Sequence, residues 1–123
     1  MNVVDSSAWL EYFADTKNGK KFEKVIENTE LLLVPSITLY EVFKKILMER
    51  DEHIALQIVA HMKMGKVIEL DMEIALSAAK FSKEFRLPMA DSIIFATGKK
   101  YHATIWTQDA DFKNLEGVKY FRK

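Results

Sequence analysis

The sequence predicts an α/β fold, in which a central, mostly parallel sheet of four to five strands carries helices on both faces. Short apolar runs alternate along the chain with longer segments whose apolar residues recur at helical spacing, and this alternation is typical of parallel sheets. The 123 residues fit one domain, spanning 1–123, and 49% of them are hydrophobic, which is enough for a core. No repeat or flexible linker divides the chain.

The first strand is expected at residues 2–4, because "NVV" is a short β-branched run that ends at Asp5. A helix is predicted over 6–14, since two serines suited to a cap precede apolar residues that fall on one helical face. Residues 17–28 have the spacing of another amphipathic helix.

The second strand is expected at 31–34, where an apolar run is stopped by Pro35. Residues 36–50 then predict a helix, and 53–64 predict a further one with Gly65 as its terminator. The apolar stripe of the first of these helices is expected to consist of Leu39, Phe43, Ile46 and Leu47.

The second half of the chain repeats the alternation. A strand at 66–70 is followed by a helix over 71–85 and another over 89–101. The run at 103–107 predicts a fourth strand, and 118–121 a fifth at the edge of the sheet.

The composition excludes several classes of protein. Eighteen basic residues balance eighteen acidic ones, so any binding of a polyanion must come from local clusters. The absence of cysteine excludes disulfides, thiolate catalysis and sulfur-ligated zinc. The N-terminus lacks the pattern of a signal peptide, and no apolar run approaches the ~20 residues that span a bilayer. A cytoplasmic protein without a membrane segment is expected.

Five acids are candidates for a functional site. In a parallel sheet all strands end at one side, where ligands bind, and Asp5 and Asp109 each follow a predicted strand. Each acid also has a structural reading. Asp5 could cap a helix, Asp91 lies in the first turn of one, Asp109 and Asp111 could cap a short turn, and Glu41 could be a solvated surface residue.

Together these acids predict a metal site. Carboxylates that converge raise one another's pKa unless a positive charge lies among them. Oxygen ligands without cysteine favour a hard cation, Mg²⁺ or Mn²⁺ over Zn²⁺. Such an ion could activate water for attack on a phosphodiester.

Four motifs, "VVDSSAWL", "PSITLYEV", "LPMADSIIFATG" and "IWTQDADF", together resemble the PIN domains, particularly the VapC-type toxin ribonucleases. The resemblance implies a PIN-like three-layer fold, a Mg²⁺- or Mn²⁺-dependent endoribonuclease acting on RNA, a homodimer, and a small antitoxin protein as partner. The family's four acids fall on Asp5, Glu41, Asp91 and Asp109.

The same resemblance assigns supporting roles to three further residues. The hydroxyls of Ser6 and Thr107 would support the carboxylates, whereas Asp111 would either assist through a water or cap the following turn. Lys44, Lys45, Arg86, Lys99 and Lys100 are candidates for holding the phosphate backbone, with a solvated charged face as the alternative reading. His61, Trp9 and Trp106 are expected to be packing residues.

Two other functions compete with this interpretation. A phosphotransfer enzyme or receiver domain would also gather acids beside a sheet, but "DSS" lacks the second acid of a DxD loop, and no GxxxxGK pattern is present. A catalytically idle binding module of the same fold is the second rival. The pocket chemistry alone does not distinguish RNA from DNA as substrate.

Overall fold

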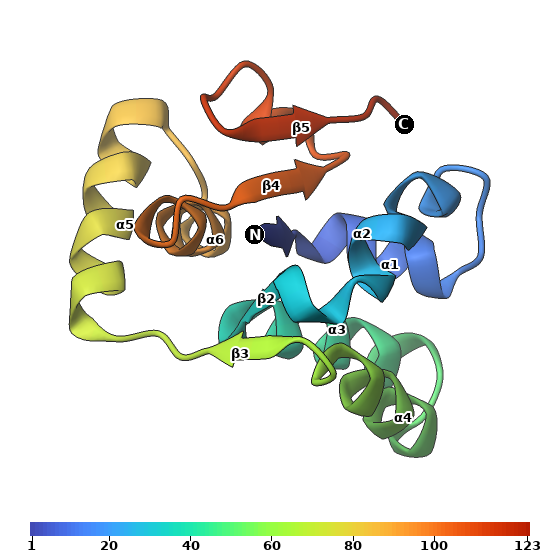
Figure 1. Cartoon of the computed structure of the whole chain (residues 1–123). Coiled ribbons are helices and arrows are strands. Elements are labelled where there is room, and N and C mark those ends of the chain that lie inside the picture. The colour runs from blue at the N-terminus through green and yellow to red at the C-terminus, as the bar shows by residue number, and fades with distance from the viewer.

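A computed structural model describes all residues, 1–123, and contains one sheet of five strands that are all parallel (Figure 1). The strand order is β3-β2-β1-β4-β5, which places the first strand at the centre and the fifth at an edge, as predicted. The strands are β1 Asn2–Val4, β2 Leu32–Pro35, β3 Lys66–Ile68, β4 Thr104–Thr107 and β5 Val118–Tyr120.

Helices cover both faces of this sheet, which confirms the predicted α/β architecture. The helices are α1 Ser6–Phe13, α2 Glu23–Glu27, α3 Ser36–Glu49, α4 Glu52–Met62, α5 Met72–Phe85 and α6 Met89–Lys100. Three short 3₁₀ helices join them: η1 Gly19–Phe22, η2 Thr29–Leu31 and η3 Ala110–Phe112. None of these helices is long and apolar enough to cross a membrane.

Alternation along the strands divides the core in two. Val3 points into a cluster completed by α5 and α6, whereas its neighbour Val4 points into a cluster completed by α1 to α4. Figure 1 shows α5 and α6 lying together on one side of the molecule, with α1 and α2 on the other. Successive strand residues face opposite sides of a sheet, so both faces must be apolar when both are covered.

Three expectations about the elements were wrong in detail. The predicted helix over 17–28 is broken into η1 and α2. The first of these helices begins at a close backbone approach, where a Cβ on Gly19 would lie 2.3 Å from the carbonyl oxygen of Glu11. The third strand stops at Ile68 rather than at residue 70, since Asp71 accepts a 2.8 Å hydrogen bond from Ile74 N–H and caps α5.

The apolar stripe of α3 also differs from the prediction. Ile46 is buried as predicted, and Leu39 and Phe43 pack partly buried against the same core. The predicted Leu47 is instead 40% exposed, and Thr38 and Val42 are buried in addition. Thr38 can be buried because its hydroxyl donates a 2.7 Å hydrogen bond to the carbonyl of Pro35. The buried face of α3 is therefore centred about one residue away from the predicted stripe. Glu41 lies half-buried beside this face rather than opposite it.

Candidate active site

The predicted acids converge at the carboxyl end of the central strands. Asp5 follows β1 directly, and its backbone N–H donates a 3.1 Å hydrogen bond to the carbonyl of Trp106 in β4. Asp109 lies just beyond the same strand, β4, while Asp91 lies in the first turn of α6. The parallel sheet thus brings together acids that are far apart in the sequence.

Three carboxylates lie close enough to share one cation. Asp91, Asp109 and Asp111 each offer an oxygen, and these atoms all lie within 4.8 Å of one another. Asp111, whose role the sequence left open, therefore lies in the cluster. Its backbone N–H also donates a 2.9 Å hydrogen bond to Asp109 Oδ1, so Asp109 caps η3 while it faces the other acids. An all-oxygen donor set at this spacing fits a hard divalent ion.

Asp5 is the most deeply buried acid of the site, at 2% exposure. Its carboxylate accepts hydrogen bonds from Ser7 Oγ at 2.9 Å and from the backbone N–H of Ala8 at 3.1 Å, so it also caps α1. Burial raises the pKa of Asp5 to about 6, although these hydrogen bonds and the Thr107 hydroxyl act to lower it. Asp5 therefore caps α1 and also lies near the other acids of the cluster.

Asp91 shows most clearly that the acids interact. Burial is the largest cause that raises the pKa of Asp91 to about 7, and the charges of Asp109, Asp5, Glu41 and Asp111 add to it in that order. The four other acids therefore all act on Asp91. A cation among them would remove this repulsion, and the acids fit that role because they cannot all ionise without cost.

Hydroxyl groups orient two of these acids. Ser6 Oγ donates a 2.6 Å hydrogen bond to Glu41 Oε1, which fixes the half-buried Glu41 side chain. The fully buried Thr107 Oγ1 accepts a 2.8 Å hydrogen bond from the backbone N–H of Asp109. Sequence reasoning named both hydroxyls but missed Ser7, which binds Asp5. Its signal was its place two residues after an N-cap acid, where a side chain can reach back.

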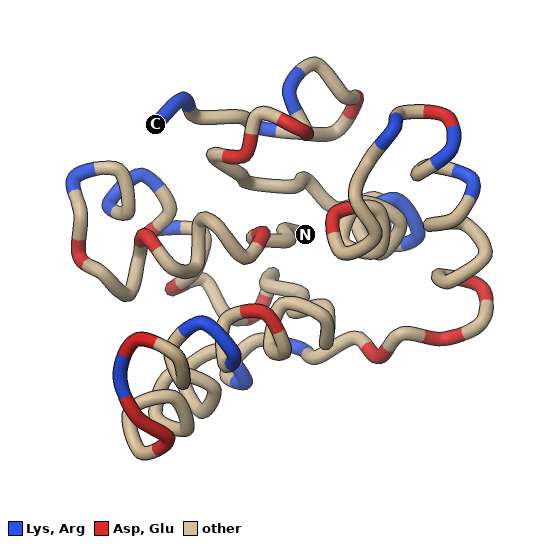
Figure 2. Tube along the Cα trace, turned by 180° about the vertical axis from the view of Figure 1, so that it is seen from behind, with Lys and Arg blue, Asp and Glu red and all other residues tan.

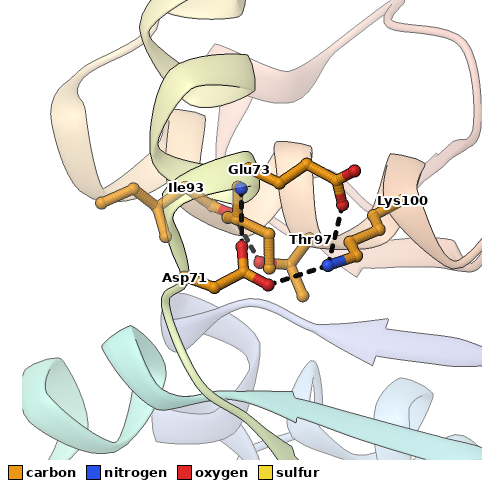
Figure 3. Close-up of polar contacts among 6 residues, drawn as sticks. Asp71, Glu73, Ile93, Thr97 and Lys100 are labelled. Atoms are coloured by element: carbon orange, nitrogen blue, oxygen red, sulfur yellow. Dashed lines mark hydrogen bonds and ion pairs between the residues drawn. The ribbon is translucent and has the colours of Figure 1, made fainter.

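Two of the five basic residues proposed from sequence, Lys45 and Lys100, form ion pairs with acids. Lys100 Nζ lies 2.8 Å from both Asp71 Oδ2 and Glu73 Oε1, as Figure 3 shows, and these hydrogen bonds raise the pKa of Lys100. Lys45 pairs with Glu49 at 3.1 Å. Lys44 and Lys45 do border a shallow hollow of about 230 Å³ that also contains Glu41.

The aromatic and histidine expectations had mixed outcomes. Trp9 is fully buried, which confirms its packing role, and Trp106 stacks on Phe121 with ring centroids 5.8 Å apart. His61 is exposed and lies outside the core, but its ring packs against two aromatic rings of α1. Its ring lies edge-on to Tyr12 and Phe13, with centroids 5.6 and 5.3 Å away.

Comparison with known proteins agrees with this architecture. The PIN domain family model matches residues 3–118. No curated protein sequence gives a match. Among solved structures, a toxin–antitoxin complex from Klebsiella pneumoniae matches with a TM-score of 0.82 and 18% identity over 100% of both chains.

Two further structures have the same fold. VapC20 of Mycobacterium tuberculosis, described as a toxin that cleaves the sarcin–ricin loop, matches with a TM-score of 0.78 and 15% identity, over 96% of this chain and 97% of that one. DNA-bound VapBC from Salmonella typhimurium matches with a TM-score of 0.75 and 15% identity, over 98% and 96%.

Proposed function

Because the chain belongs to the PIN domain family, we propose that it is a metal-dependent endoribonuclease and the toxin of a VapBC-type toxin–antitoxin pair. It hydrolyses phosphodiester bonds in RNA. One observation carries this proposal: the Asp91, Asp109 and Asp111 oxygens lie within 4.8 Å of one another, beside the buried Asp5.

The proposed cofactor is Mg²⁺ or Mn²⁺. Asp91, Asp109 and Asp111 would hold the ion, with Asp5 and Glu41 completing the acidic site. When bound, such an ion supplies positive charge that activates water and offsets the charge gathered on the phosphate. The repulsion that raises the pKa of Asp91 to about 7 supports a cation at this place.

The remaining steps belong to the side chains. Glu41 is held by the Ser6 hydroxyl and orients the attacking water. Thr107 fixes the backbone of Asp109, so that its carboxylate keeps its place in the cluster. No covalent nucleophile is required, because water itself displaces the leaving oxygen.

RNA as the substrate is supported by likeness rather than by chemistry. Water-based hydrolysis needs no ribose hydroxyl, so the acidic site would also accept a DNA phosphodiester. The likeness to VapC20 of Mycobacterium tuberculosis, a toxin that cleaves the sarcin–ricin loop, favours RNA. We place this activity in the cytoplasm, where a toxin directed at RNA meets its substrate, and treat residues 1–123 as one PIN-like domain.

A small antitoxin is the proposed protein partner, since the Klebsiella pneumoniae neighbour is a toxin–antitoxin complex. A hollow of about 370 Å³ between α1, α3 and α4 could take an apolar segment of it. Its apolar lining includes Leu10, Phe13, Ile46, Ile54 and Ile58. We also propose a homodimer, which is supported by exposed apolar side chains on and after α5, namely Met72, Leu76, Phe85 and Met89.

The experiment that tests this function is cleavage of a mixed RNA pool by the purified protein in Mg²⁺, in Mn²⁺ and in EDTA. We expect cutting in either metal and none in EDTA. Asp5→Asn protein that remains folded should not cut, because its pocket lacks one charge. Failure of the folded, metal-supplied wild-type protein to cut any RNA would instead favour the idle binding module.

A further inference from the structure

A basic surface lies beside the acids and has no part in the site described so far. Two open hollows meet there, of about 630 and 360 Å³, and they share the side chains of Tyr120, Arg122 and Lys123. The larger hollow is also lined by Lys17 and Lys21. We call Lys17, Lys21, Arg122 and Lys123 the basic strip.

The basic strip is continuous with the acidic site. The smaller hollow that contains Arg122 and Lys123 is lined at its other end by Asp109 and Ser7. Asn18, from the larger hollow, makes a side-chain hydrogen bond to Gln108, the residue before Asp109. A ligand in these hollows would therefore reach the carboxylates without leaving the surface.

The cations of the basic strip are not paired. The ion pairs in the structure involve only Lys45 and Lys100, so no carboxylate lies within 4.0 Å of the four basic-strip side chains. Lys123 acts on one acid, Glu11, and contributes only in part to lowering its pKa. The Thr16 hydroxyl lowers the pKa of Glu11 more. Figure 2 shows Lys and Arg at the C-terminal end and in the loop after α1, on the same side of the molecule.

An aromatic side chain lies between the cations. Tyr120 lines both hollows and is half-buried, so part of its ring faces the ligand space. The neighbouring Phe121 is braced, since it stacks on Trp106 and lies edge-on to Phe22 at 5.5 Å. Cations that track phosphates beside a ring that can stack on a base are the recurring composition of single-strand nucleic-acid surfaces.

We propose that the single-stranded RNA backbone leaves the acids across Arg122 and Lys123 and continues to Lys17 and Lys21, with a base against Tyr120. This inference rests on the proposed function, and it names the path by which the substrate is held. An acidic peptide would satisfy the cations as well. The aromatic ring and the continuity with a phosphodiester site favour RNA.

The test is binding of a fluorescein-labelled, mixed-sequence RNA of about 12 nucleotides, with Ca²⁺ replacing Mg²⁺, to the full chain. Lys21→Gln/Arg122→Gln removes two charges from the basic strip, and Lys80→Gln/Lys83→Gln removes two exposed charges from α5. Because the two variants have the same net charge, the comparison separates the position of the charges from their number.

We expect the basic-strip variant to bind about tenfold more weakly, and its slope of log affinity against log salt to be shallower by about 1.4, since single strands lose about 0.7 per contact. The α5 variant should bind like the wild type. Equal affinity of the two variants would overturn the proposal, as would weaker binding of a polyglutamate probe with RNA binding unchanged.

Two further results keep this test separate from that of the function. If the wild type cuts no RNA but the basic-strip variant still loses RNA affinity, the proposed function fails and the path stands. If cutting is intact and both variants bind alike, the path fails alone. Should the variants not fold, photo-crosslinks from 4-thiouridine RNA to the wild type should fall on residues 17–21 and 120–123, and crosslinks on α5 would overturn the path.

Discussion

The Ser6 hydroxyl lies 2.6 Å from Glu41 Oε1 and joins the first turn of α1 to the second turn of α3 across 35 residues of sequence. This hydrogen bond fixes the direction of the Glu41 side chain. Thr38 and Val42 form the buried face of α3, and Glu41 lies half-buried beside them, at the side of the sheet where Asp5 emerges. A single hydroxyl thus converts a helix-surface acid into a member of the acidic site.

Removing that hydroxyl should affect catalysis more than folding. Ser6→Ala removes the hydroxyl that holds the half-buried Glu41 side chain in place, so we expect a loss of roughly tenfold in the RNA cleavage rate. The melting temperature should change little, since Ala is favourable in a helix. Single-turnover cleavage measures the loss, and Ser6→Thr, which keeps the hydroxyl, should recover most of the rate. Equal losses in both variants would contradict this positioning role.

In the metal-free protein, the free energy of unfolding should fall as the pH rises. Burial and neighbouring acids raise the pKa values of Asp5 and Asp91 to about 6 and about 7, whereas both ionise near 3.8 in the unfolded chain. The folded state therefore binds more protons between these values. The stability that these bound protons contribute is fully present below about pH 4 and is lost as the pH rises towards 7.

Asp91→Asn should remove part of this dependence of the free energy of unfolding on pH. At neutral pH the metal-free variant should be more stable than the wild type by about 1–2 kcal/mol, after discounting 1.36 kcal/mol per pKa unit for the partial exposure of Asp91. Urea unfolding at pH 4 and pH 7 in EDTA measures this difference. A variant that is no more stable than the wild type at pH 7 would show that the acids do not repel one another.

Divalent metal should stabilise the folded protein through the same acids. Mg²⁺ or Mn²⁺ at ~100 times the dissociation constant should add about 2.7 kcal/mol to the free energy of unfolding. Asp111→Asn removes one of the three clustered carboxylates, so the metal-induced rise in melting temperature should shrink. Glu84→Gln on the exposed surface of α5 is the matched control and should keep the full rise. A full rise in Asp111→Asn would exclude that carboxylate from the metal site.

Gly19 should be intolerant of any side chain. A Cβ there would lie 2.3 Å from the Glu11 carbonyl oxygen and 2.6 Å from its carbon, both backbone atoms that cannot move independently. We expect Gly19→Ala to destabilise the protein by about 2 kcal/mol or more in urea unfolding. Lys20→Ala, an exposed change in the same short helix, should have little effect. A stable Gly19→Ala protein would mean that the loop from α1 to α2 packs differently.

The sequence predicted the fold and the placement of most acids for one physical reason. Asp5 and Asp109 follow apolar strands almost directly, and parallel topology makes strand ends meet. Asp111 stayed open because the direction of a side chain in a 3₁₀ turn is not readable from spacing. Thr38 was not predicted to be buried, because spacing does not reveal that its hydroxyl donates to the Pro35 carbonyl.

The basic strip could not be predicted from spacing at all. Lys17 and Lys21 lie in the loop and 3₁₀ helix after α1, whereas Arg122 and Lys123 follow the last strand, so the tertiary structure alone brings them together. Lys100, which the sequence did single out, is held instead by Asp71 and Glu73, the cap and first turn of α5. A run of like charges shows where cations are, and only the fold shows which of them are free.

The most direct test of the acidic site is the initial rate of RNA cleavage in Mg²⁺ by Asp109→Asn, beside the wild type and Glu84→Gln. Asp109 lies in the three-acid cluster, and Glu84 is an exposed acid outside it. We predict that Asp109→Asn, folded and at the same concentration, loses at least about a hundredfold in rate while Glu84→Gln keeps the wild-type rate. Undiminished cutting by Asp109→Asn would contradict it.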